Sequence, residues 1–285
     1  MPSPQARDDA AALGAPPGVA TEALKSLRLL SNVLYFRLRR GHPGKVDRHW
    51  ETYWRSVERT GQGGEVLWDS EPECASAEDL PRFRDHMDPT LPLIDFGCGT
   101  GRQTRFLARH FRRVLGTDVS PSALFKARVE TPPRRRRIEY RWLDALRPEA
   151  AEALHDEIGD ANVYMRGVLH VVQRKDRTRF AESLAILLGE KGTLYQIEIS
   201  LCALDYFRAL PGDSPSGLPR HVHKVIRTGA MSVGFDPEDR PLVYPDSHWE
   251  VLAHGEDVTI KTIVLPYGEA GRVPANYLVL RPRRR

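Results

Sequence analysis

Three glycines at every second position separate an apolar run from a helix-forming run. They are Gly97, Gly99 and Gly101, and the preceding residues 91–96 are apolar apart from Asp95. Because glycine lacks a Cβ, the backbone of such a loop can approach a ligand closely. The first N–H groups of the following helix are free to point at the same ligand. The pattern therefore predicts a site for a nucleotide-like ligand at the end of a strand.

A carboxylate at the end of the next apolar run completes the pattern. Residues 114–118 form a short apolar stretch that ends in Asp118. An acid at the end of a second strand is placed to accept hydrogen bonds from ribose hydroxyls. A dinucleotide fingerprint, Gly-x-Gly-x-x-Gly, requires its third glycine where this chain has Arg102. The spacing therefore disfavours a nicotinamide dinucleotide as the ligand.

The run from Asp95 to Gly101, Asp-x-Gly-x-Gly-x-Gly, resembles motif I of the class I S-adenosylmethionine (SAM) dependent methyltransferases. The resemblance implies that SAM is the cofactor, that the glycines meet its methionine and ribose end, and that Asp118 meets its ribose. It also implies that Asp144 and Ala145, after the third strand, meet the adenine ring. The full set of predicted cofactor-binding residues is Asp95, Gly97, Cys98, Gly99, Gly101, Asp118, Val119, Asp144, Ala145, Arg166 and Tyr53.

Three histidines are candidates for a catalytic base that serves the methyl acceptor. His170 follows the fourth predicted strand, whereas His221 and His223 lie in a long irregular region where substrate-covering elements are expected. Histidine suits this task because its usual pKa lies near neutrality. A base is needed only when the acceptor is protonated, as a hydroxyl or a phenol is. Alternatively, each histidine has a structural role, in which it caps a helix or packs in the wall of the domain. Arg166 either binds an acidic acceptor or anchors a loop.

The segment 166–170, Arg-Gly-Val-Leu-His, bears on the acceptor. It lacks the Asn-Pro-Pro-Tyr-like turn of many amino-group methylases of nucleic acid and protein, and the chain has no Pro-Cys nucleophile. The segment instead resembles small-molecule methyltransferases of the thiopurine methyltransferase-like type. This implies a small-molecule acceptor, in specialised metabolism, rather than a nucleic acid. Two alternatives stay open. An RNA or protein methyltransferase is favoured by the pI of about 9.0 and the arginine runs at 134–137 and 281–285. The second alternative is a SAM-binding enzyme of this fold that catalyses a reaction other than methyl transfer.

The elements that position these residues alternate between strands and helices. Apolar runs predict strands at residues 91–95, 114–118, 138–142, 161–165, 192–198, 258–265 and 275–280. Helices are predicted over residues 102–111, 120–129 and 176–188. Ser120 is a good capping residue and Pro121 suits the first helical position. We therefore predict an α/β, Rossmann-like class I methyltransferase fold. Its sheet is mainly parallel and seven-stranded, with a terminal antiparallel hairpin connected through residues 268–274.

Composition divides the chain into three parts. Residues 1–20 are predicted to be a disordered tail, 21–88 a helical N-terminal lid, and 89–285 the SAM-binding domain, with a substrate-covering insertion at 200–249. Leucines at helical spacing predict a basic amphipathic helix over 21–40. That helix packs on its own domain, lies on a membrane or partner, or forms a homodimer contact. The aromatic residues of 46–68 are either a hydrophobic latch or the roof of a ligand pocket.

The composition is that of an ordinary globular protein. The chain has 285 residues, of which 41% are hydrophobic and 28% charged, and its formal net charge is +4. No apolar run approaches the roughly 18 residues of a membrane span, and the N-terminus lacks the order of a secretion signal. Three widely spaced cysteines form no metal pair and indicate a reducing compartment. We therefore expect a cytoplasmic protein without a metal site.

Overall fold

The computed structural model describes most of the chain after the predicted N-terminal helix. The described residues are 46–133, 137–210, 212, 214, 219–228, 234–265 and 268–283. The predicted tail at 1–20, the predicted helix and dimer contact at 21–40, and parts of both arginine runs lie outside these residues. Among the described helices, none combines the length and apolar character that a membrane crossing requires.

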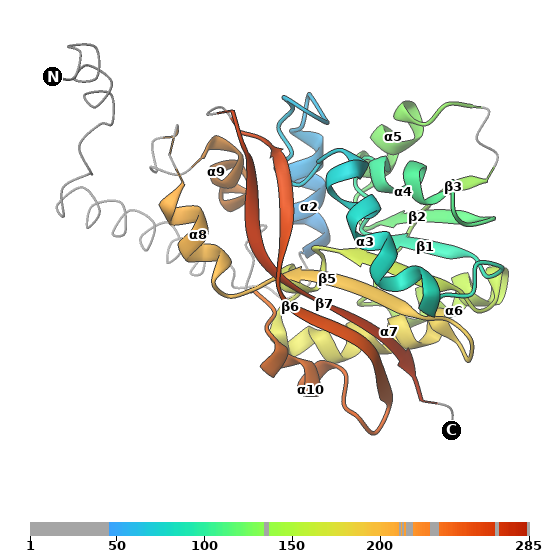
Figure 1. The fold of residues 1–285 in the computed structure, drawn as a ribbon. Helices are drawn as coiled ribbons and strands as arrows, with labels where there is room; N and C mark the ends of the chain where they lie inside the picture. The colour runs from blue at the N-terminus through green and yellow to red at the C-terminus, as the bar shows by residue number, and fades with distance from the viewer. Residues whose placement is uncertain are drawn as a thin grey trace, which may run out of the picture.

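A seven-stranded sheet forms the centre of the protein (Figure 1). Its strands, in spatial order, are β3 (Ile138–Trp142), β2 (Val114–Asp118), β1 (Leu93–Phe96), β4 (Asn162–Arg166), β5 (Leu194–Ile199), β7 (Ala270–Pro282) and β6 (Trp249–Val264). Strands β1 to β5 pair in parallel, and β7 is antiparallel to both β5 and β6. The predicted mainly parallel sheet with a terminal antiparallel hairpin is therefore confirmed. The chain order reverses between β1 and β4, and ligands of open α/β sheets bind at such a point.

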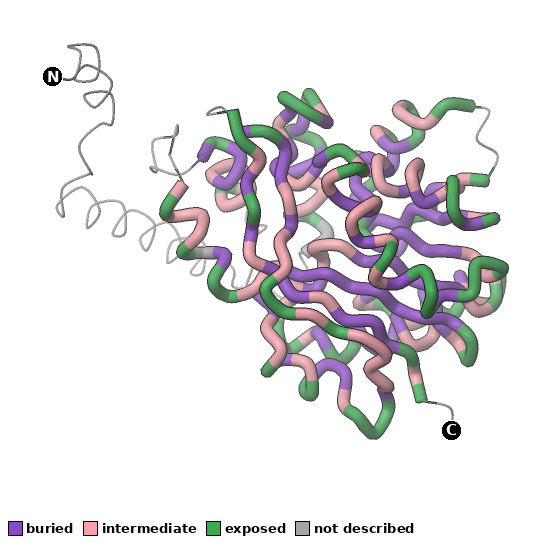
Figure 2. The backbone as a smooth tube through the Cα atoms, viewed as in Figure 1, coloured by how far each residue is buried: buried purple, intermediate pink, exposed green. Residues whose placement is uncertain are grey.

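Helices cover both faces of the sheet, and the strands are buried between them (Figure 2). The α-helices are α2 (Val46–Arg55), α3 (Ser76–Phe83), α4 (Arg102–Leu107), α5 (Pro121–Glu130), α6 (Pro148–Ile158), α7 (Arg177–Leu188), α8 (Ala203–Ala209), α9 (Arg220–Arg227) and α10 (Arg240–Val243). Helices α6 and α7 share one core with Ile94 and Met165, whereas α3 and α4 share the other with Leu93 and Tyr164. Alternate side chains of β1 and β4 thus point to opposite faces of the sheet and belong to two hydrophobic cores.

The helix starts follow local sequence. The Ser120 hydroxyl accepts the N–H of Ala123 at 3.1 Å, so Ser120 caps α5, and Pro121 occupies the first turn. Helix α4 begins directly at Arg102, after Gly101 in the left-handed conformation, but ends at Leu107, earlier than predicted. Helices α6, α8, α9 and α10 are additions to the predicted helices, and the last three lie in the region 200–249 that was predicted to be irregular.

The terminal hairpin is longer than its apolar runs predict. Strand β6 begins at Trp249 and β7 at Ala270, and Gly268, at φ 91°, lies in the turn between them. The predicted connection at 268–274 is therefore wrong, because most of it belongs to β7. The pairing shifts register between Gly255 and Val258, where Asp257 has φ 57°. This bulge breaks the alternation that marks a strand, so the early half of β6 reads as a loop.

Candidate active site

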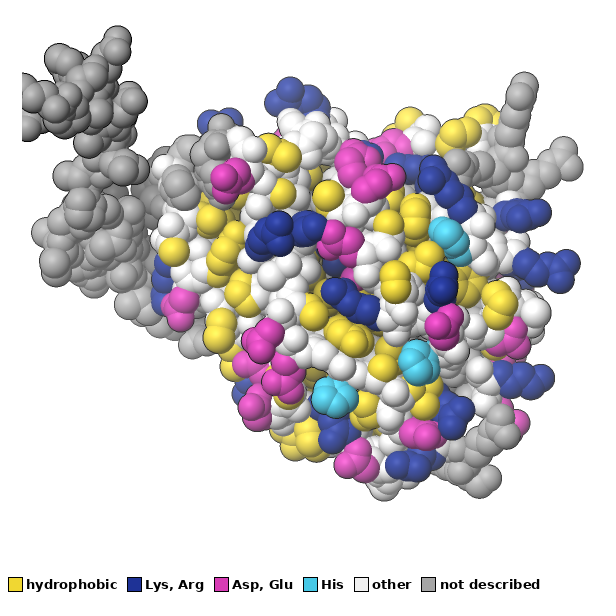
Figure 3. All heavy atoms as spheres, viewed as in Figure 1, with side chains coloured by type: hydrophobic (Ala, Val, Ile, Leu, Met, Phe, Trp, Pro, Cys, Tyr) yellow, Lys and Arg dark blue, Asp and Glu magenta, His cyan; other side chains and the backbone are white. Residues whose placement is uncertain are grey.

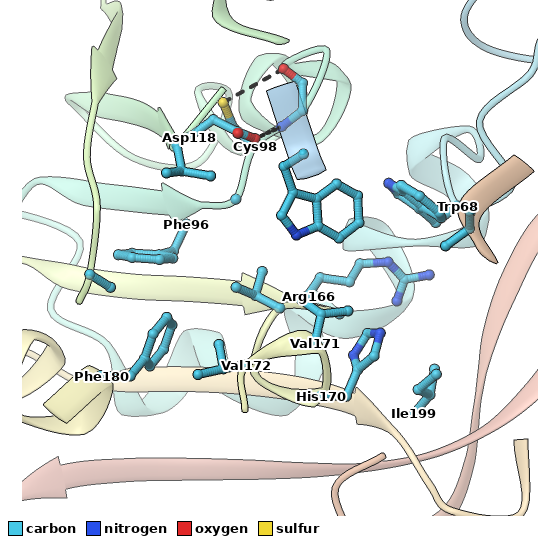
Figure 4. Close-up of a pocket in the computed structure, with 18 of the residues that line it drawn as sticks. Trp68, Phe96, Cys98, Asp118, Arg166, His170, Val171, Val172, Phe180 and Ile199 are labelled. Atoms are coloured by element: carbon cyan, nitrogen blue, oxygen red, sulfur yellow. Dashed lines mark hydrogen bonds between the residues drawn. The ribbon is translucent and has the colours of Figure 1, made fainter. Parts of the chain in front are cut away.

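A cavity of about 1150 Å³ opens at the carboxyl ends of the parallel strands (Figure 4). The glycine loop after β1 forms one end of it. Helix α2, the short helix η4 (Leu169–Val171) after β4, and the inner sides of α8, α9 and the β6–β7 hairpin form the rest. Pockets for single small ligands usually hold about 300–1000 Å³. The volume therefore accommodates a nucleoside cofactor together with a second small molecule.

The glycine loop has a backbone that side chains would disturb. Gly97, Gly99 and Gly101 have φ angles of 73°, 52° and 70°, in the left-handed region that favours glycine. A Cβ on Gly99 would lie 2.9 Å from the indole of Trp54, and a Cβ on Gly101 would lie 2.1 Å from the Tyr140 hydroxyl. Gly97 and Gly99 thus offer bare backbone to the cavity, whereas Gly101 lies outside the lining and makes room for Tyr140.

Asp118 ends β2 with its carboxylate against the glycine loop. One oxygen accepts the N–H of Gly99 at 3.0 Å, and the other accepts the N–H of Ser120 at 2.9 Å. Burial raises the pKa of the Asp118 carboxyl to about 6. Because each carboxylate oxygen accepts up to two hydrogen bonds, both oxygens retain capacity for ribose hydroxyls. Figure 4 shows Asp118 beside Cys98 at the loop end of the cavity.

Asp95 and Cys98 also line this end. The Thr104 hydroxyl donates to Asp95, whose pKa is raised to about 7, mainly by burial and further by the charge of Asp118. Burial likewise raises the pKa of the Cys98 thiol well above its usual range, so the sulfur is a neutral neighbour of the ligand rather than a thiolate.

The adenine end predicted from the sequence is also part of the cavity. Val119, Asp144 and Ala145 all line it. Asp144 accepts the N–H of Leu146 at 2.9 Å and pairs with Arg147 at 3.3 Å, and these contacts fix its carboxylate at the rim.

Arg166, at the end of β4, belongs to a buried cluster around Asp79 of α3. Asp79 accepts the hydroxyls of Tyr164 and Tyr195 at 2.7 and 2.9 Å and the guanidinium of Arg82 at 2.9 Å. Arg166 approaches Asp79 only to 3.5 Å, and its buried Nη2 has no hydrogen-bond partner. Two guanidinium groups thus share one carboxylate. The excess positive charge lies at the cavity wall, where it attracts an anion.

His170, the first of the histidine candidates, lies on η4 with its ring in the cavity wall (Figure 4). Its Nδ1 is 2.7 Å from Glu198 at the end of β5. Glu198 is fully buried, and its oxygens also accept the backbone N–H groups of Val168, Leu169 and His170 at 3.1, 2.8 and 3.1 Å. Within the described residues, Nε2 of His170 makes no hydrogen bond. Sequence reasoning missed Glu198, although an acid at the end of a buried strand is a usable signal.

The other two histidine candidates do not line the cavity, which corrects that expectation. Helix α9 presents Val222, Val225 and Ile226 to the cavity, and these positions share one face of a helix. His221 is directed away and its Nε2 lies 3.1 Å from the carbonyl of Gly64. His223 is half-buried outside the cavity lining.

The aromatic segment before the domain acts both as latch and as wall. Trp50, Trp54 and Trp68 line the cavity, but Tyr53 does not, which corrects its predicted place at the cofactor. Tyr53 is fully buried and stacks on Trp68 with ring centroids 5.4 Å apart. It helps to anchor α2 instead. Glu51 of the same helix accepts hydrogen bonds from the Ser120 hydroxyl and from the hydroxyl and N–H of Ser122 at the start of α5.

The residue types around the glycine loop fit SAM. Gly97 and Gly99 line the cavity with backbone alone, Asp118 has free lone pairs beside them, and Arg166 has a buried nitrogen without a hydrogen-bond partner. The described residues contain no group of three or more side chains that could hold a metal ion.

Comparisons with known proteins agree with the fold. A family model described as a methyltransferase domain matches residues 93–192. A crystal structure of a SAM-dependent methyltransferase from Anabaena variabilis shares 40% sequence identity over 84% of this chain and 95% of its own, with a TM-score of 0.75. Together with the glycine loop and the sheet order, this similarity defines the class: the chain belongs to the SAM-dependent methyltransferases, and SAM is its cofactor.

Two further relatives are more distant. The probable S-adenosylmethionine-dependent methyltransferase CRG1 of Saccharomyces cerevisiae is 35% identical over 83 residues, a match that spans 25% of this chain and 28% of that protein. A structure studied for the conversion of a disulfide bond into a thioacetal group during echinomycin biosynthesis shares 19% identity over 77% of this chain and 86% of its own, with a TM-score of 0.58. The latter similarity concerns the fold alone.

Proposed function

We propose that the protein transfers a methyl group from SAM to a small-molecule acceptor. One observation carries this proposal: a single cavity continues from the glycine loop, past Arg166 and His170, into a mainly apolar compartment. That compartment is walled by Trp50 and Trp68 on one side and by residues such as Phe207 and Ile226 on another. A walled compartment of this kind suits a small apolar molecule better than a polymer.

The chain's own residues account for cofactor binding in this proposal. Asp118 accepts the ribose hydroxyls, and Val119, Asp144 and Ala145 surround the adenine ring. The backbone of the glycine loop meets the methionine end, and the guanidinium of Arg166, which lines the cavity, takes the methionine carboxylate. When bound, SAM supplies a methyl group already activated on a sulfonium.

Positioning is then the main task of the protein. Methyl transfer is an in-line displacement, and holding the acceptor atom and the methyl carbon in near-attack geometry supplies roughly 7–11 kcal/mol of the barrier. The walls of the acceptor compartment do this by shape, and they exclude water from the reacting atoms. Of the three histidine candidates, only His170 has the access that a base would need.

Surface charge gives little support to a nucleic-acid acceptor. Basic and acidic side chains are interspersed over the face seen in Figure 3. Of the described arginines in the C-terminal run, Arg281 pairs with Glu250, and Arg283 donates to the backbone carbonyl of Asp246. A phosphate backbone is bound best by unpaired basic side chains gathered on one surface.

The first experiment measures binding by calorimetry with SAM, S-adenosylhomocysteine and NAD. We expect SAM and S-adenosylhomocysteine to bind and NAD not to bind. The second supplies labelled SAM together with small-molecule extracts, total RNA or total protein. Label in small molecules supports the proposal. Label in RNA or protein overturns the acceptor class, and release of labelled fragments without methyl transfer points to another reaction of the same fold.

A further inference from the structure

The His170–Glu198 pair is more than methyl transfer in general requires. Carboxylates and unprotonated amines attack an activated methyl group without a base, so an acceptor of either kind needs no histidine in the wall. Yet this fold buries the Glu198 carboxylate completely and directs it at the His170 ring. A buried charge is costly unless it is fully bonded, so the pair calls for a chemical explanation.

The hydrogen bonds around Glu198 determine which ring nitrogen of His170 carries the proton. Both carboxylate oxygens are acceptors only, and four donors converge on them: three backbone N–H groups and the ring Nδ1. Nδ1 must therefore hold its hydrogen. In the neutral ring Nε2 is then an acceptor, and it belongs to a side chain that lines the cavity. Figure 4 shows the ring reaching up toward Arg166.

We propose that Glu198 is a positioning residue that fixes Nε2 of His170 as the proton acceptor, and that the methyl acceptor is therefore a hydroxyl on a planar apolar compound, such as a phenol. This inference rests on the proposed methyl transfer and names the substrate class of the same site. It goes beyond that function because a small-molecule acceptor could equally be an amine, a thiol or a carboxylic acid.

The compartment beside His170 suits a planar apolar molecule. The indoles of Trp50 and Trp68 meet nearly at right angles, with ring centroids 5.7 Å apart and an interplanar angle of 81°. Both line the cavity, as do Ile199 and Phe207. Tyr53 stacks on Trp68 from outside the cavity lining, so a flat ring contacts the parts of the two indoles that line the cavity.

The proposed step balances as follows. The acceptor O–H bond breaks, and its proton passes to Nε2 of His170. The oxygen lone pair forms the new C–O bond with the methyl carbon. The electron pair of the broken S–C bond stays on sulfur, which becomes a neutral thioether. The imidazolium of His170 is held by the Glu198 carboxylate until the proton leaves to water.

Glu198→Gln tests the positioning role with almost no change in shape. A glutamine has one oxygen and one NH₂ group. With its oxygen toward Val168 and Leu169, its NH₂ group faces both the backbone N–H and Nδ1 of His170. The backbone N–H then loses its acceptor, and the proton of the ring is forced onto Nε2. The base is then lost while the cavity keeps its form.

The chain provides a control with similar hydrogen bonds, in a half-buried carboxylate–histidine pair at the amino ends of the parallel strands. Asp160 lies before β4, 3.0 Å from the ring of His155, and it accepts the N–H groups of Glu190 and Lys191 at 3.2 and 3.1 Å. This carboxylate–histidine pair resembles the one at Glu198 but does not line the cavity. Asp160→Asn therefore reports what the loss of such a carboxylate does to the fold alone.

The first readout is the tautomer of His170 in protein labelled with ¹⁵N-histidine and saturated with S-adenosylhomocysteine, with the signal assigned through His170→Asn. Above neutral pH we expect a protonated Nδ1 and a bare Nε2 in the wild type and in Asp160→Asn. We expect the opposite tautomer in Glu198→Gln. Addition of phenol should move the Nε2 resonance of the wild type. A protonated Nε2 in the wild type, or no response to phenol, overturns the proposal.

The second readout compares phenol with thiophenol, which has a similar shape but ionises near neutrality without help. Glu198→Gln and His170→Asn should lower turnover of phenol on the order of 10²-fold or more, and that of thiophenol far less. Equal losses, or methylation of amines or carboxylic acids in place of phenols, overturn the proposal. SAM affinity measured in the same variants separates this failure from failure of the proposed function, which would appear as no SAM binding even in the wild type.

Discussion

Asp118→Asn separates the cost of burying a carboxylate from its use in binding SAM. The Asp118 side chain accepts one N–H on each oxygen, from Gly99 and from Ser120. Asparagine keeps the shape and one acceptor oxygen. It replaces the other oxygen with an NH₂ group that faces one of these N–H donors.

The two effects of this substitution differ in size. The pKa of about 6 lies roughly two units above the usual value for Asp, so burial costs the ionised form about 3 kcal/mol at neutral pH, and asparagine removes that cost. An unsatisfied N–H costs about 1–3 kcal/mol in return. The free energy of unfolding should therefore change little. SAM loses a charge-assisted bond worth about 1.5–3 kcal/mol, or about 10- to 140-fold in Kd.

Calorimetry with SAM and thermal unfolding of the ligand-free protein measure both quantities on one sample. Asp160→Asn, which changes a half-buried carboxylate outside the cavity, should leave the SAM affinity unchanged. Unaltered SAM affinity in Asp118→Asn would refute the ribose role. A parallel collapse of stability and affinity would show that Asp118 serves the loop rather than the ligand.

Three further predictions follow from the same site. Gly99→Val places a Cβ 2.9 Å from Trp54 at a φ of 52° and should abolish SAM binding in calorimetry. The control Gly63→Ala has a φ of 74° and open space around it, so it should cost about 1–2 kcal/mol of stability and keep the SAM affinity. Arg166→Met should weaken SAM about tenfold or more but leave methylthioadenosine, which has no carboxylate, unaffected; equal losses for both ligands would contradict a carboxylate contact. Because burial raises the folded-state pKa values of Asp95 and Asp118 to about 7 and about 6, the folded protein binds more protons than the unfolded chain between these values and about pH 4. The contribution of these two groups to the free energy of unfolding therefore increases as pH falls through that window. The same contribution decreases as pH rises towards about 7. Urea midpoints against pH should slope less in Asp118→Asn than in the wild type, and identical slopes would contradict the assignment.

The cofactor loop could be predicted because its signal is local. A strand, a turn that needs positive φ angles and a helix start follow one another within 91–107, and no distant residue has to be known. The acid that ends β2 lies in register with β1 through parallel pairing, so its approach to Gly99 follows from the fold class. The β6–β7 hairpin was harder to predict, because the bulge at Asp257 interrupts the alternation of apolar and polar residues that would indicate β6.

The acceptor side depends on contacts between distant segments. The sequence does not distinguish His170, His221 and His223 as candidate bases. Helix α9 packs with Val222 and Ile226 toward the cavity, and this places His221 and His223 outside its lining. Tyr53 is likewise separated from the cofactor by its packing on Trp68.

The sequence by itself determined the order of the strands, the glycine loop and the acids that accompany it, because backbone conformation and strand ends are encoded by neighbouring residues. Only the tertiary structure decided that Glu198 holds His170 and that Asp79 leaves Arg166 with a free nitrogen. Glu198 lies 28 positions from its partner and Asp79 lies 87 from its own. Such pairs form where chain crossovers bring strand ends and a covering helix together, and no local pattern of residue types records that geometry.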